Sequence, residues 1–385
     1  MPAGIEQALT VIEREDPPMT PWTFHNPVDV RAGNGALAQL PRLVGARDAL
    51  LIAFPEAEAL GLVGRVRELL GDRLVAVETD IRPNPDLRWL APLYERLWRG
   101  HRDARCVIAL GGGSSIDCAK AMLTATPSGR FDELLDHLVD PKAAPLSADA
   151  PHRALIAVPT TAGTGSEVTP WATLWDAARG RKHSLHLPWT WPEAAIVDPS
   201  LMVSLPVGAT LASGLDALSH ALEALWNVHR NPVSSSLAAS AARAIVATLP
   251  ALLREPRRLD LREALAVAAL QAGMAFSNTR TALAHSLSYD ITLTRGTAHG
   301  IACSFSLPRV MRLAFGRDAA LDARLLSIFD AADADGAVAA LERFLAALGV
   351  STDPADYGIS PDDWDARVAQ ALRGPRGRNF IQALA

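Results

Sequence analysis

The feature that most constrains the fold is an alternation of short apolar runs with amphipathic helical patterns in the first half of the chain. The apolar runs cover residues 49–54, 74–77, 106–110, 154–158 and 194–198. Helical patterns lie between them, for example over residues 60–70 and 87–98. Strands that are apolar on both faces are typical of parallel sheets covered by helices on both sides. We therefore predict an α/β structure built on a buried parallel sheet.

The pattern changes after Pro206. Helical periodicity then continues, with scarcely any strand-like alternation, over residues 209–226, 234–253, 261–276, 319–332 and 337–348. A chain of 385 residues is long enough for more than one domain. We predict an α/β domain over residues 1–205 and an all-α domain over residues 206–385. Residues 131–150 carry Pro and Asp, which predicts a surface loop.

Charge and cysteine usage narrow the class of partner. The net charge is −5 and is spread without long runs of one sign, so there is no basic footprint for nucleic acid. The three cysteines form no CxxC pair, which fits a reducing cytosol. Residues 1–16 show no secretory signal, and apolar stretches such as 264–272 are too short to span a bilayer. We expect a cytoplasmic protein without a nucleic-acid or membrane partner.

A glycine-rich turn, Gly111-Gly112-Gly113-Ser114, follows the apolar run at 106–110 and opens a predicted helix. Successive glycines let the backbone approach a phosphate, and N–H groups at a helix N-terminus point at its oxygens. The turn is neither the GxGxxG fingerprint nor a Walker loop, so a purely structural turn is the alternative. Asp117 and Lys120 follow in the same helix, and their alternatives are a helix-dipole partner and a surface charge.

A second polar strand exit runs from Thr160 to Ser166, directly after the apolar run at 154–158. In an open α/β sheet the ligand crevice lies beyond the carboxyl ends of the strands. We therefore expect Thr160, Thr161 and Ser166 to converge with the glycine turn on one nucleotide. The alternative is that these are loop residues whose side chains satisfy their own backbone.

Four residues in the helical region offer metal ligands. Asp216 and His220 are four apart, which places them on the same face of a helix. His285 and His299 lie in later segments that also show helical patterns. One carboxylate and three imidazoles suit a divalent first-row metal such as iron or zinc. The alternative for the first pair is a solvated helix face.

Together these blocks resemble the iron-dependent (group III) alcohol dehydrogenases. The blocks are GGGSSID from residue 111, PTTAGTGSEVT from residue 159, AIVDP from residue 195, the DAxxHxxE pattern within residues 214–223, and AHG from residue 298. They follow the order and spacing of the family. The resemblance implies a Rossmann-like N-terminal domain that binds NAD(P) and a helical C-terminal domain, with one Fe²⁺ or Zn²⁺ in the cleft between them.

The resemblance also implies which residues hold each group. Matched by position, the metal ligands are Asp216, His220, His285 and His299. The cofactor contacts are Gly111, Gly112, Gly113, Ser114, Asp117, Thr160, Thr161, Ser166 and Lys182. The implied reaction is reversible hydride transfer between NAD(P)H and a small aldehyde or primary alcohol, with the metal as a Lewis acid. A homodimer formed through the N-terminal edge is implied as well.

Two positions depart from the family pattern. Many members have a second histidine that relays a proton four residues after His285, and this chain has Tyr289 there. A tyrosine hydroxyl can relay a proton, but its ordinary pKa of about 10 makes it a poor base. Many members also have a ribose-binding aspartate where this chain has Phe54. A missing carboxylate removes a repulsion against a 2′-phosphate, so NADPH is expected to serve at least as well as NADH.

A narrower resemblance is to the phosphonoacetaldehyde reductases of phosphonate biosynthesis. It rests on residues 279–289, Trp189, Trp191 and Trp226-Asn227. It implies reduction of phosphonoacetaldehyde to 2-hydroxyethylphosphonate, with Arg280 as a bidentate phosphonate contact and further charge from Lys182 or His183. The alternatives are a helix-cap or surface role for Arg280 and a general short-chain alcohol dehydrogenase.

Two other functions stay open on the sequence alone. A dehydroquinate synthase-like lyase shares this architecture and uses both NAD and a metal, but it regenerates its cofactor. A non-catalytic binding protein with a relict site is the second. A reductase consumes one NAD(P)H per aldehyde, so cofactor stoichiometry separates the reductase from the other two.

Overall fold

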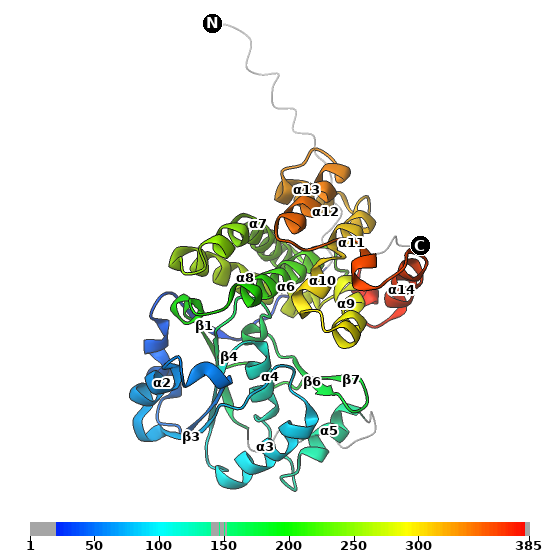
Figure 1. Cartoon of the computed structure of the whole chain (residues 1–385). Coiled ribbons are helices and arrows are strands. Elements are labelled where there is room, and N and C mark those ends of the chain that lie inside the picture. Colours follow the sequence, from blue (N-terminus) through cyan, green and yellow to red (C-terminus); the bar gives the residue numbers. More distant parts are fainter. Residues whose placement is uncertain (1–20, 140–145, 147–149, 151, 382–385) are drawn as a thin grey trace, which may run out of the picture.

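The structure is a computed structural model that describes residues 21–139, 146, 150 and 152–381. The N-terminal stretch in which we looked for a secretory signal lies outside these residues. An α/β half, blue to green in Figure 1, adjoins a helical half, green to red.

The α/β half contains a six-stranded sheet in the order β1-β8-β5-β4-β2-β3. Its strands are β1 (Asp29–Ala32), β2 (Ala49–Ala53), β3 (Leu74–Glu78), β4 (Cys106–Gly111), β5 (Ala154–Pro159) and β8 (Ala194–Val197). All neighbouring strands pair in parallel. Every predicted apolar run forms a strand, and the predicted parallel sheet is confirmed.

Alternate residues of the central strands pack against helices on opposite faces. Leu50 and Val107 face α3 (Leu87–Gly100) and α5 (Phe131–Val139), whereas Leu51 and Ile108 face α1 (Leu40–Val44) and α2 (Leu62–Leu70). Both layers bury apolar side chains, which explains why these strands carry no polar face.

The predicted loop over residues 131–150 is wrong at its start. Residues 131–139 form α5, because Phe131 and Leu134 are buried in the core beside α3. The Pro and Asp residues that suggested a loop lie mostly after this helix. Downstream, β6 (Ala172–Asp176) and β7 (Arg181–Leu185) form a separate antiparallel hairpin.

The second half is helical. Its helices are α6 (Val207–Leu225), α7 (Pro232–Arg254), α8 (Leu259–Thr279), α9 (Leu283–Arg295), α10 (His299–Ser304), α11 (Leu307–Ala314), α12 (Ala319–Phe329), α13 (Ala334–Ala347) and α14 (Pro361–Arg373). Among the described residues no named strand follows β8. The predicted fold class is thus confirmed, and the domain boundary at residue 205 stays a prediction.

One helix bears on the membrane expectation. α7 is long and apolar enough to cross a bilayer, with a mean hydropathy of 1.6, so the expectation that every apolar stretch is too short does not hold for it. It packs against α6 and α8 and buries Ile245 and Leu249 between them. A core helix meets the same criterion, so length and composition here are weak evidence for a membrane span.

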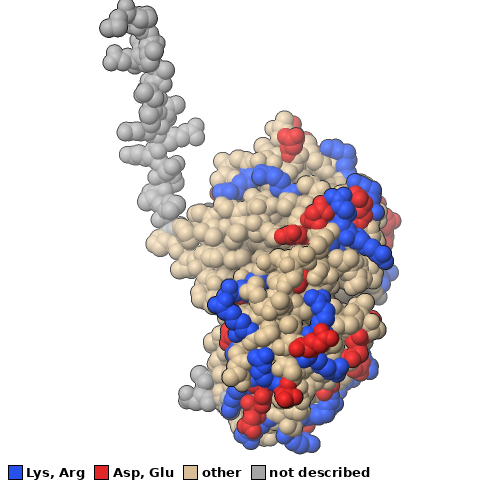
Figure 2. All heavy atoms as spheres, turned by 90° about the vertical axis from the view of Figure 1, so that its left-hand side faces the viewer, with Lys and Arg blue, Asp and Glu red and all other residues tan. Residues whose placement is uncertain are grey.

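On the face drawn in Figure 2, acidic and basic side chains are interspersed.

Candidate metal centre and cofactor site

Helix α6 provides the first two predicted ligands and is buried from Gly214 to Leu225. Asp216 and His220 lie one turn apart on it, 4% and 5% exposed. The Nε2 atom of His220 is 3.8 Å from Oδ1 of Asp216. The pair is therefore not a solvated helix face.

His285 and His299 approach the same carboxylate from two later helices. Nε2 of His285, near the start of α9, is 3.5 Å from Oδ1 of Asp216. Nε2 of His299, the first residue of α10, is 3.9 Å from that oxygen. Two donors each about 2.1 Å from a tetrahedral metal ion are roughly 3.4 Å apart, so these spacings are those of ligands around one ion.

Gly300 allows α10 to approach α6 closely enough for His299 to reach Asp216. A Cβ atom at Gly300 would lie 1.8 Å from the carbonyl oxygen of Ala212 and 2.9 Å from the amide nitrogen of Asp216. Any side chain at this position would push the two helices apart and move His299 away from the other ligands.

Glu223 orients His285. Its carboxylate is completely buried, and Nδ1 of His285 lies 2.7 Å from its Oε2. It also accepts hydrogen bonds from the backbone N–H groups of Ala282, Ala284 and His285. A carboxylate at Nδ1 places the proton there and leaves the Nε2 lone pair free for a metal. Glu223 falls within the DAxxHxxE block, but the sequence analysis gave it no role.

Three buried atoms at this centre have no hydrogen-bond partner among the described residues. One is Nδ1 of His220, and the other two, Oδ1 of Asp216 and Nε2 of His285, lie 3.5 Å apart. Buried polar atoms are rarely left without a partner, and a cation bound between these atoms would satisfy both. A carboxylate with imidazoles also suits Fe²⁺ or Zn²⁺. The residues present therefore fit the metal that the sequence predicts.

The local electrostatics favour a cation. Burial raises the pKa of Asp216, but His220, His285 and His299 outweigh this and hold it well below its usual value. Burial lowers the pKa of His220 to about 4, so its imidazole is neutral at pH 7. Burial also opposes a charge on His285, yet Cys303 and Glu223 raise its pKa well above the ordinary value. A site that attracts a proton in this way also attracts a metal ion in its place.

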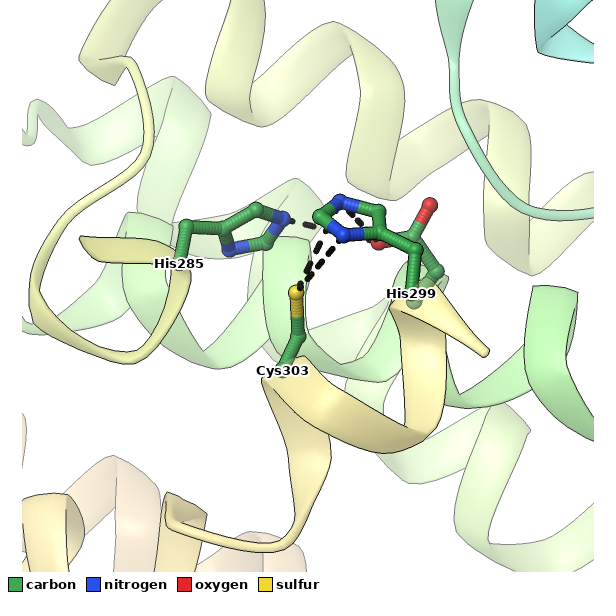
Figure 3. Close-up of side chains that lie close together, drawn as sticks. His285, His299 and Cys303 are labelled. Atoms are coloured by element: carbon green, nitrogen blue, oxygen red, sulfur yellow. Dashed lines mark hydrogen bonds and ion pairs between the residues drawn. The ribbon is translucent and has the colours of Figure 1, made fainter. Parts of the chain in front are cut away.

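Cys303 joins the centre, which the sequence analysis did not predict. Figure 3 shows its side chain rising from α10 toward His285 and His299. One donor atom from each of Asp216, His285, His299 and Cys303 lies within 4.8 Å of the others. Burial raises the pKa of Cys303, but the two histidines outweigh it and lower this pKa to about 6. In the sequence, the feature that could have indicated this role is the position of Cys303 four residues after His299.

The predicted glycine turn joins β4 to α4 (Gly113–Ala121) and is tightly enclosed. Gly111 has a φ of +152°, and a Cβ atom there would lie 2.3 Å from Oγ of Ser115 and 3.3 Å from the ring of Phe54. A Cβ atom at Gly113 would lie 2.7 Å from Cγ2 of Thr164. Glycine is therefore required at these two positions, and Phe54 lies beside the turn.

The two polar strand exits are neighbours, as expected from the pairing of β4 with β5. A Cβ atom at Gly112 would lie 3.2 Å from Thr161. The glycines of the second exit have another role. A Cβ atom at Gly163 would lie 2.8 Å from the carbonyl oxygen of Ser213, and one at Gly165 would lie 2.7 Å from Cα of Gly273. This exit is thus packed directly against α6 and α8. Thr160 is buried in it.

Asp117, Lys120 and Ser166 form a polar network behind the turn. Ser166 donates from Oγ to Asp117 at 2.7 Å, and the other oxygen of Asp117 accepts from the N–H of Thr173. Lys120 is completely buried and donates to the carbonyl oxygens of Ser166 and Trp171. A surface role for Lys120 is therefore wrong, because α4 packs the lysine against a loop whose carbonyl groups take the place of water. Ser114 accepts from the N–H of Asn84.

Lys182 extends from β7 to helix α9. Its Nζ lies 4.3 Å from the centre of the Tyr289 ring, and the guanidinium of Arg376 lies 4.7 Å from the same centre. Burial, together with the charge of Arg376, lowers the pKa of Lys182 to about 8. Burial raises the pKa of Tyr289 to about 12, so this hydroxyl keeps its proton at neutral pH. Arg376 lies in no recognised motif, and the sequence analysis missed it.

Arg280 has a strained backbone. It caps the C-terminus of α8 with φ +68° and ψ 173°, a region that is nearly confined to glycine and costs about 1–3 kcal/mol. Its carbonyl oxygen accepts from Nδ2 of Asn227 at 3.1 Å, and its side chain is exposed. Burial and, after it, the charge of Arg280 lower the pKa of His186. The residue is thus a helix cap, as the alternative expected, and it also places a positive charge near His186.

An α/β half with a glycine turn at the sheet edge and a helical half with a carboxylate–imidazole centre are consistent with a metal-dependent dehydrogenase. Comparison with known families agrees. The model for iron-containing alcohol dehydrogenase matches residues 27–199, and the model for the C-terminal part of the same family matches residues 210–383. The chain belongs to the iron-containing alcohol dehydrogenase family and is an oxidoreductase, as predicted.

Three similar proteins show which activities occur among the relatives of this chain. The NAD-dependent methanol dehydrogenase of Bacillus methanolicus is 32% identical over 88% of this chain and 90% of that protein. The phosphonoacetaldehyde reductase of Streptomyces viridochromogenes is 38% identical, but over only 54% of this chain and 53% of that protein. The structure of sulfoacetaldehyde reductase from Bifidobacterium kashiwanohense in complex with NAD⁺ has a TM-score of 0.85 and 28% identity, covering 95% of this chain and 96% of that one.

Proposed function

We propose that the protein is a metal-dependent NAD(P)H oxidoreductase that reduces phosphonoacetaldehyde to 2-hydroxyethylphosphonate. The observation that carries this proposal is a pair of cations that lie against one aromatic ring beside the metal centre. Lys182 and Arg376 both lie against Tyr289, one helical turn after His285, and neither forms an ion pair with a described residue. The lowered pKa of Lys182 shows that burial and the charge of Arg376 destabilise its charged form. A bound anion would stabilise the charged form of both side chains.

The chemistry of the cations points to an oxyanion group on the substrate. A guanidinium binds phosphonate through two parallel hydrogen bonds, and an ammonium adds a point charge. Two of the relatives are named for two-carbon aldehydes with an acidic group, phosphonoacetaldehyde and sulfoacetaldehyde. Arg280, on the adjoining loop, is proposed as a third positive charge. A neutral short-chain aldehyde would use none of these groups and is the second candidate substrate.

When bound, the metal supplies Lewis-acid polarisation of the carbonyl oxygen and the nicotinamide supplies the hydride. Asp216, His220, His285 and His299 would hold the metal, and Glu223 would keep the proton on Nδ1 of His285. Lys182 and Arg376 hold the acidic end of the substrate, which leaves its aldehyde end for the metal centre. Tyr289 retains its proton, so we assign it to proton donation or relay rather than to a base.

The nucleotide is proposed to bind along the two strand exits. The glycine turn from Gly111 to Ser114 would hold the pyrophosphate, with Asp117, Thr160, Thr161, Ser166 and Lys182 around the remainder. Phe54 stands where a carboxylate would disfavour a 2′-phosphate, and we therefore propose that NADPH serves at least as well as NADH. Measurement of kcat/KM for both cofactors checks this.

The proposal is tested by comparing phosphonoacetaldehyde with acetaldehyde in wild type and Arg376→Gln. Loss of one charged contact costs about 1.5–3 kcal/mol, so kcat/KM for the phosphonate should fall roughly 10–100-fold. The value for acetaldehyde should stay nearly constant. Arg373→Gln, an exposed arginine on α14, is the matched control and should change neither value. A wild type that prefers acetaldehyde, or an equal loss with both aldehydes, contradicts the proposal.

We also propose a cytoplasmic homodimer joined along β1. Among the residues that the structure describes, this strand is at the edge of the sheet and pairs only with β8, which leaves one row of its backbone groups without a described strand partner. Light scattering of the purified protein gives the oligomeric state directly, and a monomer at micromolar concentration contradicts the dimer.

A further inference from the structure

We propose that Cys303 is a fifth protein ligand of the metal, a thiolate donor that shifts the preference of this centre toward Zn²⁺. The inference rests on the metal centre of the proposed function. It adds a donor that neither the spacing of the four predicted ligands nor the chemistry of the reaction requires.

The position of the sulfur is the first argument. Cys303 lies one helical turn after His299 on α10, so both side chains project from the same face. Its Sγ is 3.6 Å from Nε2 of His299. A sulfur about 2.3 Å and a nitrogen about 2.1 Å from one five-coordinate ion are roughly 3.1–3.8 Å apart. The distance to Nε2 lies in this range, although Sγ is also 3.8 Å from Nδ1 of His299 and only within 4.8 Å of the other donors.

The surroundings of the sulfur are the second argument. Cys303 is completely buried, yet it belongs to none of the three apolar clusters of the described core. The other buried cysteines do: Cys106 lies in the cluster beneath α1 and α2, and Cys118 lies in the cluster beneath α3. Figure 3 shows the Cys303 side chain directed at the imidazoles instead. Its burial is thus explained by polar neighbours and not by apolar packing.

The unpartnered atoms are the third argument. Oδ1 of Asp216 and Nε2 of His285 are buried without a hydrogen bond, and both belong to the same group of donors as Sγ. Three donors of different chemistry, two of them without a partner, converge on one small space. A packing cysteine explains none of this, whereas a shared cation explains all of it.

The consequence is a change in metal preference. Oxygen and nitrogen donors accept iron and zinc alike, but thiolate is a soft ligand that favours zinc. Cys303 would bind the metal as the thiolate, and no electron is transferred in this step.

X-ray absorption of the zinc-loaded full-length protein tests the proposal. We expect one sulfur scatterer at about 2.3 Å in wild type, its loss in Cys303→Ser, and its retention in Cys118→Ser. Zinc affinity, measured by competition with a chromogenic chelator, should fall at least ~10-fold in Cys303→Ser and stay constant in Cys118→Ser. The ratio of zinc to iron affinity should fall with it.

The outcomes separate this inference from the proposed function. A zinc-loaded wild type whose shell contains only nitrogen and oxygen overturns the role of Cys303 and leaves the metal centre intact. A wild type that binds no metal removes both. If Cys303→Ser does not fold, the absorption spectrum of wild type beside Cys118→Ser still decides, because the sulfur shell is either present in both or absent from both.

Discussion

Glu223 shows how far the metal centre depends on a residue that binds no metal. Its carboxylate holds Nδ1 of His285 and three backbone N–H groups in a completely buried position. In Glu223→Gln the amide nitrogen cannot accept the hydrogen bonds that Oε1 or Oε2 now accepts. We expect metal affinity to fall about 10–100-fold, with a lower melting temperature. Chelator competition and thermal melts measure the two effects.

The control for that variant is Glu263→Gln, since Glu263 is an exposed carboxylate on α8. It should leave both measurements unchanged. Unchanged metal affinity in Glu223→Gln would show that His285 is oriented by packing alone.

Lys182 gives the anion site a pH dependence. Its pKa is lowered to about 8, below the ordinary 10.5, so its positive charge is nearly complete at about pH 7 and is lost as the pH rises through about 8. The ratio of kcat/KM for phosphonoacetaldehyde to that for acetaldehyde should therefore fall above pH 8. Any change in cofactor binding affects both aldehydes equally and therefore cancels in the ratio. Lys182→Met should have a lower ratio without this pH step. A ratio that is flat from pH 7 to pH 10 in wild type contradicts the role of Lys182.

The sequence predicted the residues whose spacing is itself informative. Asp216 and His220 are four apart, and His285 and His299 fall in recognisable blocks, so all four could be named in advance. Cys303, four residues after His299, has such a spacing too, but its approach to His285 depends on the fold. Arg376 could not be named, because it acquires its role from a contact between distant segments. Arg376 reaches Tyr289 from beyond α14, and no local pattern encodes that approach.

At the scale of elements, one close contact between the two halves is a pair of glycines. Gly165, with φ +62°, lies against Gly273 of α8, and a Cβ atom at Gly273 would be 2.8 Å from Cγ2 of Val168 and 2.9 Å from Cα of Gly165. We expect Gly273→Ala to destabilise the protein by about 1–3 kcal/mol, because added volume here must displace backbone. Denaturant unfolding measures the change.

Gly208→Ala is the matched comparison. Gly208 is in the first turn of α6 and a Cβ atom there would meet nothing within 4 Å. This substitution should be neutral or slightly stabilising, since alanine favours a helix. Equal stability of both variants would show that the halves tolerate a looser contact than the structure has.

Most elements were predictable because their patterns are local. The apolar runs became strands and the periodic segments became helices. The failures have a common physical cause. Helix α5 was taken for a loop because its composition resembles one, and it forms because Phe131 and Leu134 find apolar partners in distant residues. The glycines at 163 and 165 were given no role in the sequence, whereas tertiary packing against α6 and α8 requires them.

At the scale of the whole molecule, the metal should stabilise the fold. Its donors come from three helices, so binding favours the native state over the unfolded chain, which cannot assemble the site. Removal of metal by a strong chelator should abolish turnover and lower the melting temperature. At a metal concentration of about 100 times Kd the stabilisation is roughly 2.7 kcal/mol. Equal melting temperatures with and without measured metal would contradict this coupling.

The architecture is shared by reductases, by lyases that regenerate their cofactor and by inactive binding proteins, so fold alone does not decide among them. A reductase differs from the other two classes because it consumes its nicotinamide cofactor. The metal can hold the substrate only if His285 and the other ligands bind that metal. NAD(P)H is oxidised only if its hydride is transferred to the product.

The most direct test is therefore the amount of cofactor oxidised per aldehyde, on protein of measured metal content, in wild type and His285→Ala. We predict one NAD(P)H consumed per phosphonoacetaldehyde in metal-loaded wild type, and loss of both metal and turnover in His285→Ala. Product formation without net cofactor oxidation, or a His285→Ala variant with full metal content and full turnover, would contradict the account.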